Sequence, residues 1–522
     1  MVKKSLITKT VRWSVQLVFL GLFIYLFIQT QYKAPFKSPQ LFFKFDPLIL
    51  LITSIAYRTI IAASLPALIT LAATLLLGRF FCGFVCPLGT TIDIFDTALS
   101  RVSVTARCRA TDQAHNKPAF SKTASRRTHL LKNLKYLILL FLILTAVLGS
   151  SFLHFFDPLV IFERSLTLIL FPIITYFAAV FFIVNNAIYT ETLIALAIFL
   201  LIISTGFMTE RFWCKKLCPF GGILALVSKI SLFRFTFHEN CSKCGLCTEI
   251  CPTEAIDWPK EKIDSAECIN CFKCEYECPT KTIKYGFNFK PTRVDLTRRQ
   301  LITTLVMSLV AVPLSRSLLH RRLEGRLLRP PGSVPETDFM NVCIHCGKCM
   351  KVCPTNGLQP CVLEAGVNGF WTPRLVPRIG GCEKNCNRCG QVCPTTAVRN
   401  LSLEEKSYAK IGTAVIDRSR CIAWDQNKVC LICDEACQYN AISSLNETVR
   451  GITLLRPFVD KRICLGCGVC ESRCPLEGRS AIEVYAIGEE RKKMGSYVTA
   501  EKRELREFNK LEEDIPSGFI TE

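Results

Sequence analysis

The sequence predicts a multidomain chain in which an N-terminal α-helical membrane domain, with about four transmembrane helices, is followed by several small α+β domains. Three observations predict this architecture. Long apolar runs fill the first half of the 522 residues, a pair of motifs is repeated within that half, and most of the 30 cysteines gather in tight groups in the remainder. A chain of this length is also too long for one small domain.

The cysteine groups begin with two tandem copies of C-x2-C-x2-C-x3-C-P. A bacterial ferredoxin binds two [4Fe-4S] clusters with this spacing, because three thiolates of one loop and a fourth from the other surround each cluster. A single copy could be a zinc knuckle, but the tandem arrangement favours a two-[4Fe-4S] ferredoxin-like domain over residues 236–290. The expected ligand sets are Cys241, Cys244, Cys247 and Cys278 for one cluster, and Cys268, Cys271, Cys274 and Cys251 for the other.

Four further groups of four cysteines lie within residues 336–485, which we interpret as a four-cluster polyferredoxin domain. A disulfide framework is the alternative for many cysteines, but it is typical of short secreted chains. Short apolar segments such as 414–416 and 482–484 predict strands between the groups. With the first two groups, the chain has 24 candidate ligands for six [4Fe-4S] clusters. The four later groups are Cys343, Cys346, Cys349 and Cys353; Cys382, Cys386, Cys389 and Cys393; Cys421, Cys430, Cys433 and Cys437; and Cys464, Cys467, Cys470 and Cys474.

The formal net charge of +21 overstates the basic character of the protein. A [4Fe-4S] cluster with its four thiolates carries about −2, so six clusters bring the total to about +9. The remaining Lys and Arg stand beside apolar runs, where they act as topology signals. We therefore expect a membrane as partner, and no nucleic acid.

Residues 1–235 form the predicted membrane domain. The first apolar run, 13–28, has no small-residue cleavage site after it, so we interpret it as a transmembrane helix with a cytoplasmic N-terminus rather than a signal peptide. A second run of this kind covers 134–150. Basic residues within 101–135 predict that the two cysteine loops of the repeat described next lie in the cytoplasm.

A duplicated unit follows each of these two helices. It consists of a Phe-Asp-Pro-Leu turn, a returning apolar stretch and a loop Arg-Phe-x-Cys-x3-Cys-Pro-x-Gly, so two copies predict four spanning helices. The second copy is longer by 21 residues. We interpret the surplus, around 166–184, as a bent and half-inserted segment; a further spanning helix is the alternative.

The two loops contribute four more cysteines, Cys82, Cys86, Cys214 and Cys218. They form a candidate redox site, which could be a further cluster, a disulfide relay or a folding staple; buried unpaired thiols are the neutral alternative. Arg58 and His154 are candidate quinone contacts, since ionisable groups at membrane depth are functional by default. An arginine that reaches the interface and a capping histidine are the neutral alternatives.

Residues 291–335 have two interpretations. Arg298 and Arg299 precede an apolar run, 301–314, as in a twin-arginine export signal. The alternative is an amphipathic helix packed on the membrane. Residues 486–522 are charged and lack a core pattern, so we expect a tail there. Cys108 and Cys361 belong to no group.

These motifs resemble two known families of 4Fe-4S binding proteins, apparently fused. Residues 1 to about 290 resemble the NapH type of membrane ferredoxin, and residues from about 293 to 485 resemble the NapG/MauM type of polyferredoxin. In such polyferredoxins the first group pairs with the fourth and the second with the third. The resemblance implies these sets: Cys343, Cys346, Cys349 with Cys474; Cys464, Cys467, Cys470 with Cys353; Cys382, Cys386, Cys389 with Cys437; and Cys430, Cys433, Cys421 with Cys393.

The group Cys382, Cys386, Cys389 and Cys393 departs from the spacing expected for the nitrate-reductase form. This departure argues against nitrate reduction as the pathway. The sequence contains no Ser/His/Asp arrangement, phosphate loop or haem-attachment motif, and we assign no catalytic residue. We expect an electron carrier rather than a self-sufficient enzyme.

The expected carrier is a multi-pass protein of a bacterial or archaeal inner membrane. It would pass electrons between the quinone pool, or a ferredoxin-type donor, and a reductase or cytochrome partner. If the four-cluster domain is exported to the outer face, about 30 Å of hydrocarbon separates the two cluster groups and quinol is needed as a carrier. The alternative is a maturation factor that supplies electrons to cofactor assembly in a partner enzyme.

Overall fold

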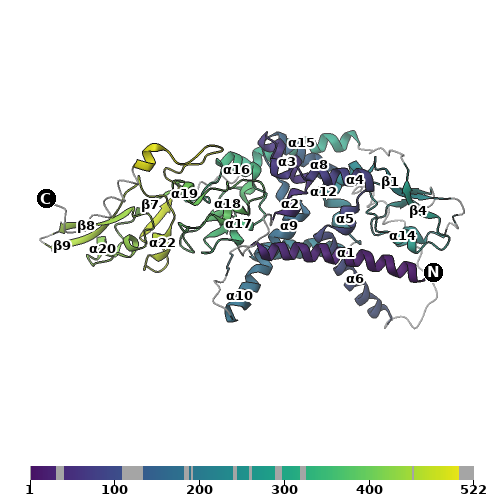
Figure 1. Cartoon of the computed structure of the whole chain (residues 1–522), viewed down its shortest axis with the longest axis horizontal. Coiled ribbons are helices and arrows are strands. Elements are labelled where there is room, and N and C mark those ends of the chain that lie inside the picture. Colours follow the sequence, from purple (N-terminus) through teal and green to yellow (C-terminus); the bar gives the residue numbers. More distant parts are fainter. Residues whose placement is uncertain are drawn as a thin grey trace. The chain divides into compact units, whose positions relative to one another are not determined.

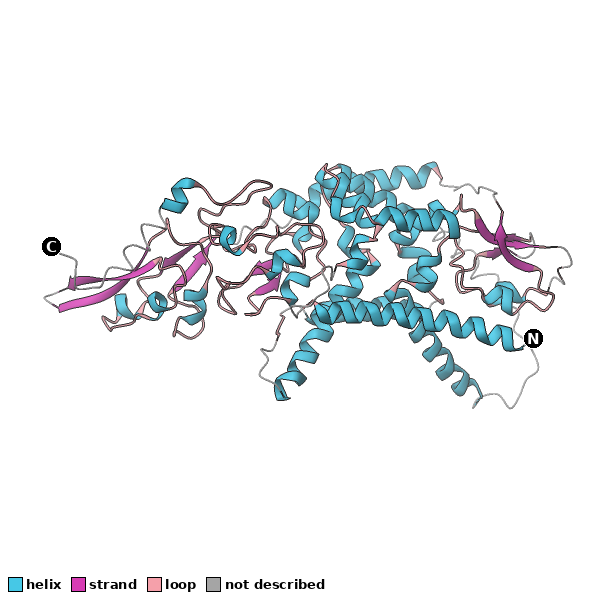
Figure 2. Ribbon diagram, in the orientation of Figure 1, coloured by secondary structure: helices cyan, strands magenta, loops and turns pink. Residues whose placement is uncertain are grey.

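The chain divides into two compact units in a computed structural model (Figures 1 and 2). Unit 1 comprises Met1–Leu166 and Leu193–Leu314, and unit 2 comprises Thr167–Thr192 and Ser315–Glu522. The structure describes residues 2–30, 40–108, 133–181, 187–189, 192–207, 209–238, 241, 244–257, 261–288, 297–317, 325–449 and 452–504.

The first part of unit 1 is helical (Figure 1). The helix α8 packs against α3 and α12, and α1 packs against α5 and α6. The elements are α1 Val2–Gln29, α2 Leu41–Lys44, α3 Pro47–Tyr57, η1 Ala62–Ser64, α4 Ala67–Leu77, α5 Phe80–Phe84, α6 Pro87–Cys108, α8 Leu134–Val147, η2 Leu153–Phe155, α9 Pro158–Ser165, η3 Leu166–Leu170, α11 Thr192–Ser204, η4 Thr205–Phe207, η5 Trp213–Leu217 and α12 Pro219–Ser228.

The repeated Phe-Asp-Pro-Leu motif starts a helix in each copy. Asp46 is the N-cap of α3 and accepts hydrogen bonds from Leu48 N and Ile49 N, at 2.8 and 3.2 Å. Asp157 is the N-cap of α9, and it accepts two such bonds of 2.9 Å. Proline follows at the first helical position, where its missing N–H is not needed. Both aspartates are completely buried.

The returning stretch of the first copy is broken rather than continuous. α3 ends at Arg58, which has a φ of 55° and forms the C-cap in the left-handed region. A second helix, α4, then leads to the cysteine loop. The 11 residues of α3 rise only about 16 Å, less than the hydrocarbon thickness of about 30 Å. The expected single spanning helix between Asp46 and Cys82 is therefore two shorter helices.

Two helical stretches in the described part of the chain are long and apolar enough to cross a membrane, Thr10–Gln29 and Pro158–Phe181. The first coincides with the predicted N-terminal span. The second runs through the surplus of the second copy, where a bent segment was expected; the π-helical turn η3 joins α9 to α10, and the helix continues past Pro172. Five other apolar helices have 10–17 residues.

Unit 1 ends in a small α+β domain whose first and last strands pair. Strand β1 (Phe233–Phe237) lies antiparallel to β4 (Ile283–Phe287), with Phe235 opposite Tyr285. We call residues 233–287 module A. Between the two strands lie α13 Leu246–Glu249, β2 Ile256–Asp257, β3 Lys262–Ile263 and α14 Lys273–Tyr276, and α15 Arg298–Ser317 follows the module.

Unit 2 contains the rest of the cysteine groups and begins with the insert 167–192. Within this unit, Ile188 O accepts hydrogen bonds from the side chains of Asn356 and Gln359, both at 3.0 Å. The elements are α10 Phe171–Phe181, α16 Glu336–Val342, α17 Lys348–Lys351, β5 Leu358–Pro360, η7 Val367–Gly369, β6 Pro373–Leu375, α18 Arg388–Gln391, α19 Leu403–Lys406, β7 Thr413–Ile416, α20 Ile422–Asp425, α21 Ile432–Glu435, β8 Ile442–Val449, β9 Ile452–Val459, α22 Val469–Arg473 and β10 Ile482–Tyr485.

Two further modules in unit 2 are also closed by antiparallel pairing of their ends. Residues 333–398, module B, are closed by a bridge between Ser333 and Val398. Residues 413–485, module C, are closed by the pair β7–β10, which confirms the two strands predicted at 414–416 and 482–484. The hairpin β8–β9 projects from module C.

Most side chains of residues 486–504 are exposed or half-buried, as expected for a surface helix or tail, but one residue anchors the segment to unit 2. Tyr497 is fully buried and packs with Leu401 and Ala409. The charged residues around it concealed this contact, because a single aromatic anchor produces no periodic pattern. Residues 505–522 lie outside the described part.

Candidate metal centres

Module A brings Cys251 to the loop that carries Cys268, Cys271 and Cys274. Burial raises the pKa of Cys274, and the neighbouring thiols of Cys268, Cys271 and Cys251 raise it further. This is the crossed arrangement that the tandem spacing predicts, in which the fourth cysteine of one group joins the other. Although partial burial raises the pKa of Cys278, hydrogen bonds with Thr282 and Thr280 bring it down to about 7.

Each cysteine loop turns through a residue in the left-handed region. Gly245, between the second and third cysteines of the first group, has a φ of 74°. Phe272 holds the same place in the second group with a φ of 61°, a conformation that is strained for a bulky residue. Its ring lies 5.1 Å from that of Phe235 and 5.5 Å from that of Tyr285, and this packing holds the loop in place.

Module C corrects the cysteine sets that the family resemblance implied. One cavity is lined by Cys421, Cys430, Cys433 and Cys474. A second is lined by Cys437, Cys464, Cys467 and Cys470. The third and fourth groups therefore exchange their last cysteines with each other. The strand pair that closes this module brings those two neighbouring groups together.

Module B follows the same rule and corrects the remaining implied sets. Burial raises the pKa of Cys349, and the thiols of Cys346, Cys343 and Cys393 raise it further. Burial also raises the pKa of Cys389, and the nearby thiols of Cys382, Cys353 and Cys386 raise it further. The first group thus receives Cys393, and the second receives Cys353.

The sulfur atoms already accept backbone hydrogen bonds. The Sγ of Cys251 accepts from Ala255 N at 3.3 Å, that of Cys393 from Val398 N at 3.4 Å, and that of Cys437 from Ala441 N at 3.2 Å. Such donors stabilise the thiolate form that metal binding requires. In the described residues no three His, Cys, Asp or Glu side chains converge closely enough for one metal ion. Four thiolates around one cavity are the ligand set of a [4Fe-4S] cluster.

The duplicated loops of unit 1 form a seventh set of four cysteines. Cys82, Cys86, Cys214 and Cys218 line one cavity, which we call the base cavity. The structure thus brings together the four cysteines that the repeat predicted as a further redox site.

Two repeat-related arginines lie beside the base cavity and are completely buried. The guanidinium of Arg211 binds both carboxylate oxygens of Asp93 at 2.6 Å and donates to Cys82 O at 2.9 Å. Arg79 donates to Ala266 O at 2.6 Å and lies 3.7 Å from Glu267. Both arginines open the repeated Arg-Phe-x-Cys loop, and no role was predicted for them. Their matching positions in the two copies are the sequence feature that indicates a shared role.

Two more buried cations complete this network. Arg12 lies 2.7 Å from Asp93. Lys135 lies 2.5 Å from Glu267, and its side chain is fully buried. Four buried cations therefore surround two carboxylates.

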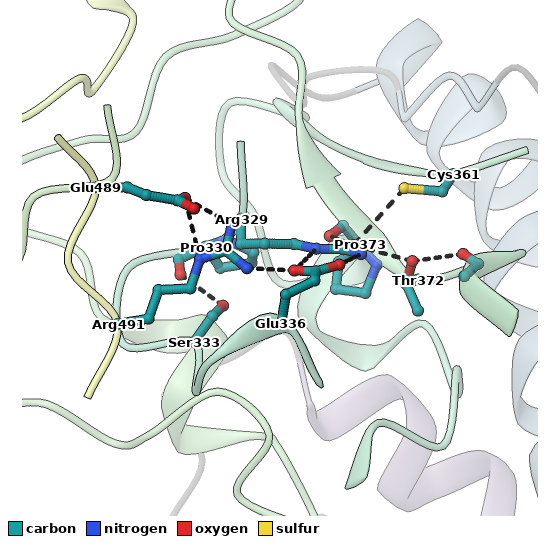
Figure 3. Close-up of polar contacts among 10 residues, drawn as sticks. Arg329, Pro330, Ser333, Glu336, Cys361, Thr372, Pro373, Glu489 and Arg491 are labelled. Carbon is teal, nitrogen blue, oxygen red and sulfur yellow. Dashed lines mark hydrogen bonds and ion pairs between the residues drawn. The ribbon is translucent and has the colours of Figure 1, made fainter. Parts of the chain in front are cut away.

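In unit 2, Arg329 fixes the linker that precedes module B (Figure 3). Its Nη2 lies 2.6 Å from Glu336, and its Nη1 donates to Thr372 Oγ1 at 2.9 Å and to Pro373 O at 2.8 Å. Figure 3 shows Glu336 between the guanidinium groups of Arg329 and Arg491. Cys361, one of the two ungrouped cysteines, is fully buried beside this site. The side chain of Cys108 lies outside the described part.

The two candidate quinone contacts occupy different environments. Arg58 is exposed at the end of α3, whereas His154 is fully buried, and its backbone oxygen accepts a hydrogen bond from Arg164 at 3.1 Å. They do not form one site. Arg298 and Arg299 are exposed in the first turn of α15, which Thr297 and Gln300 begin with reciprocal side-chain hydrogen bonds.

Comparisons with known proteins agree with the cysteine geometry. Residues 59–102 and 192–238 match a family described as a 4Fe-4S binding domain, residues 240–282 match a 4Fe-4S dicluster domain, and residues 339–359 match another 4Fe-4S binding domain.

Three relatives extend this likeness over longer stretches. The methylamine utilization ferredoxin-type protein MauM of Methylorubrum extorquens is 32% identical over 167 residues, covering 31% of this chain and 74% of the relative. MauM of Paracoccus denitrificans is 35% identical over 168 residues, 31% and 72% of the two chains. The ferredoxin-type protein NapG of Escherichia coli is 32% identical over 197 residues, 37% and 84%. The chain therefore belongs to the family of 4Fe-4S polyferredoxins that includes MauM and NapG.

Proposed function

We propose that this protein is a membrane-bound electron carrier with six [4Fe-4S] clusters, two in each module. The single observation that carries the proposal is the threefold repetition of two cysteine groups between paired end segments. The last cysteine of each group is turned toward the other group in modules B and C, and Cys251 is turned toward the second group in module A. Thiolate-bound clusters change charge by one electron with little rearrangement, and their potentials respond to nearby hydrogen bonds and burial. The donors found at Cys251, Cys393 and Cys437 are of that kind.

The proposed ligands are the 24 cysteines of the six groups. They are Cys241, Cys244, Cys247 and Cys278; Cys268, Cys271, Cys274 and Cys251; Cys343, Cys346, Cys349 and Cys393; Cys382, Cys386, Cys389 and Cys353; Cys421, Cys430, Cys433 and Cys474; and Cys464, Cys467, Cys470 and Cys437. When bound, the clusters supply one-electron transfer. The chain's own residues hold the thiolates, exclude water and set the local charge.

The proposed anchor is the helical part of unit 1, resembling the NapH type, and the four-span, multi-pass inner-membrane topology remains part of the proposal. The two long apolar helices support membrane attachment. Export of modules B and C to the outer face is the finer proposal. A reporter fused after Tyr485 tests it, because periplasmic reporter activity supports export and cytoplasmic activity refutes it.

The function is tested with protein purified anaerobically in detergent. We expect about 24 iron and 24 acid-labile sulfide per chain from the six sets, more if a further site is filled, and brown absorbance that bleaches on reduction. Zinc in place of iron would refute the proposal.

The electron donor is tested by rapid mixing of the oxidised protein with a short-chain quinol. Reduction of the clusters supports passage of electrons from the quinone pool to a reductase or cytochrome. If the protein accepts electrons from reduced ferredoxin but not from quinol, the result supports a ferredoxin-type donor or a role in cofactor maturation instead.

A further inference from the structure

The base cavity is similar in lining to the cavities of module C, because each is lined by four cysteines and mostly apolar side chains. Its lining is apolar apart from Arg79 and the four thiols, and includes Trp213 and Phe220. Four thiols around one apolar space are the ligand set of a [4Fe-4S] cluster.

The local structure directs both thiols of each pair into this cavity. Cys82 and Cys86 are four residues apart, as are Cys214 and Cys218, so one helical turn places each pair on a common face. Cys218 is the N-cap of α12, and its Sγ accepts a hydrogen bond from Gly221 N at 3.3 Å. This contact resembles those at the fourth cysteines of the modules.

The arginines cross between the two copies of the repeat. A Cβ atom added at Gly221, in the second copy, would lie 2.9 Å from Nη2 of Arg79, in the first. A Cβ added at Gly89, in the first copy, would lie 3.8 Å from Nη2 of Arg211, in the second. Glycine in the Cys-Pro-x-Gly part of the motif therefore leaves room for the partner copy's guanidinium next to the thiols.

Buried cations lie directly beside the thiols. Nη2 of Arg79 is 4.0 Å from Sγ of Cys82, and Arg211 donates a hydrogen bond to Cys82 O at 2.9 Å. Positive charge beside a thiol favours its thiolate form, and a [4Fe-4S] cluster with four thiolates carries about −2. Arg12 and Arg211 also lie near Cys271 of module A.

Module A rests directly on the helix that carries Cys82. Arg79 donates to Ala266 O at 2.6 Å, and the rings of Phe84 and Phe272 are 6.4 Å apart. A Cβ at Gly83 would lie 2.2 Å from Ile269 O, so the two backbones touch. The residues in contact adjoin Cys82 on one side and Cys268 and Cys271 on the other.

We propose that Cys82, Cys86, Cys214 and Cys218 bind a seventh iron–sulfur cluster, one thiolate to each iron, and that it exchanges single electrons with the neighbouring cluster of module A. In each transfer one cluster loses an electron and the other gains it, with no further reactant. The second half of the proposal rests on the proposed function of module A; the first half does not.

Native mass spectrometry of the unaltered chain, purified anaerobically, tests the count without any variant. Seven clusters, or about 28 iron and 28 sulfide, support the proposal. A chain with six clusters, or one with a single copper or zinc ion at the base cavity, refutes it. A chain with no iron at all refutes the proposed function as well, so the two failures are distinguishable.

Variants then assign the extra cluster to its ligands. The double variant C82A/C214A, which removes one thiol from each copy, should lose about 4 iron and 4 sulfide per chain and keep the other clusters. The matched control is Cys361→Ala, which removes a buried thiol outside every proposed set and should keep all the iron. If the double variant is too unstable to purify, the single variants C86S and C218S give the same readout. Unchanged iron in every variant refutes the assignment.

Discussion

The contact between Gly83 and Ile269 gives the sharpest test of how module A is docked. In Gly83→Ala the new Cβ would lie 2.2 Å from Ile269 O, and since ordinary contact begins at 3.4 Å, the atoms must separate by about 1.2 Å. Helix α5 cannot simply retreat, because Gln16 on α1 donates a hydrogen bond of 2.9 Å to Gly83 O. The loop that carries Cys268 must therefore yield.

The expected destabilisation of the docked loop is about 2–3 kcal/mol. Overpacked sites lose about 1–3 kcal/mol, and the obstacle here is a backbone carbonyl that cannot rotate away. A loss of about 2 kcal/mol corresponds to roughly 30-fold faster local opening, since 1.4 kcal/mol is a factor of ten. Hydrogen–deuterium exchange of the amides of residues 266–270 measures this change directly.

Gly286→Ala is the matched control for this experiment. Gly286 lies in β4 of the same module, and a Cβ there would meet nothing within 4 Å. We expect it to leave exchange at residues 266–270 unchanged. If the two variants exchange at the same rate, the backbone contact does not hold the module, and the proposed electron path through it loses its support.

Three further predictions concern unit 2. Glu336→Gln should lower the free energy of unfolding of this unit by about 2–3 kcal/mol, measured by thermal unfolding. The loss is smaller than the roughly 3–5 kcal/mol for breaking a fully buried ion pair, because about a third of the Glu336 side chain is exposed. Burial raises the pKa of Glu336, but the neighbouring arginines outweigh this effect and lower it below its usual value of 4.5. The stabilisation that the Glu336 carboxylate gives to unit 2 is therefore present above pH 4.5 and is lost as the pH falls through the lower folded-state pKa. The variant should lack this acid dependence. Cys421→Ser and Cys474→Ser should each lose about 4 iron per chain, and the double variant should lose the same 4. A loss of about 8 in the double variant would instead support the pairing that the family resemblance implied, in which Cys421 and Cys474 bind different clusters. Tyr497→Ala should cost about 3 kcal/mol and expose residues 486–504 to protease, whereas Met494→Ala, at a side chain that is 81% exposed, should change neither.

The local features were predictable because they depend on nearby residues. The cysteine spacing predicted that Cys251 joins the second group of module A, and short apolar segments predicted the strands β7 and β10. The repeated motif predicted that its four cysteines belong together, and they line one cavity. In each case the signal lies within a few residues of its consequence.

The features that sequence reasoning missed depend on distant partners. Which cysteine groups pair is decided by the strands that close each module, and spacing alone does not reveal those strands. Arg58 breaks α3 through a left-handed conformation that an apolar run does not announce. Arg79 and Arg211 are buried beside carboxylates that come from distant parts of the chain, Glu267 in a turn of module A and Asp93 on α6.

The exchange of cysteines between neighbouring groups has a consequence for biosynthesis. All proposed ligands of one cluster pair lie within 241–278, within 343–393 or within 421–474, so each proposed set is complete before the ribosome has made the next stretch. Short-range closure of this kind is fast and keeps folding units independent. From the proposed sets we expect stepwise insertion of iron and sulfide into the nascent polypeptide, and an oxidative loss of one pair that leaves the others folded.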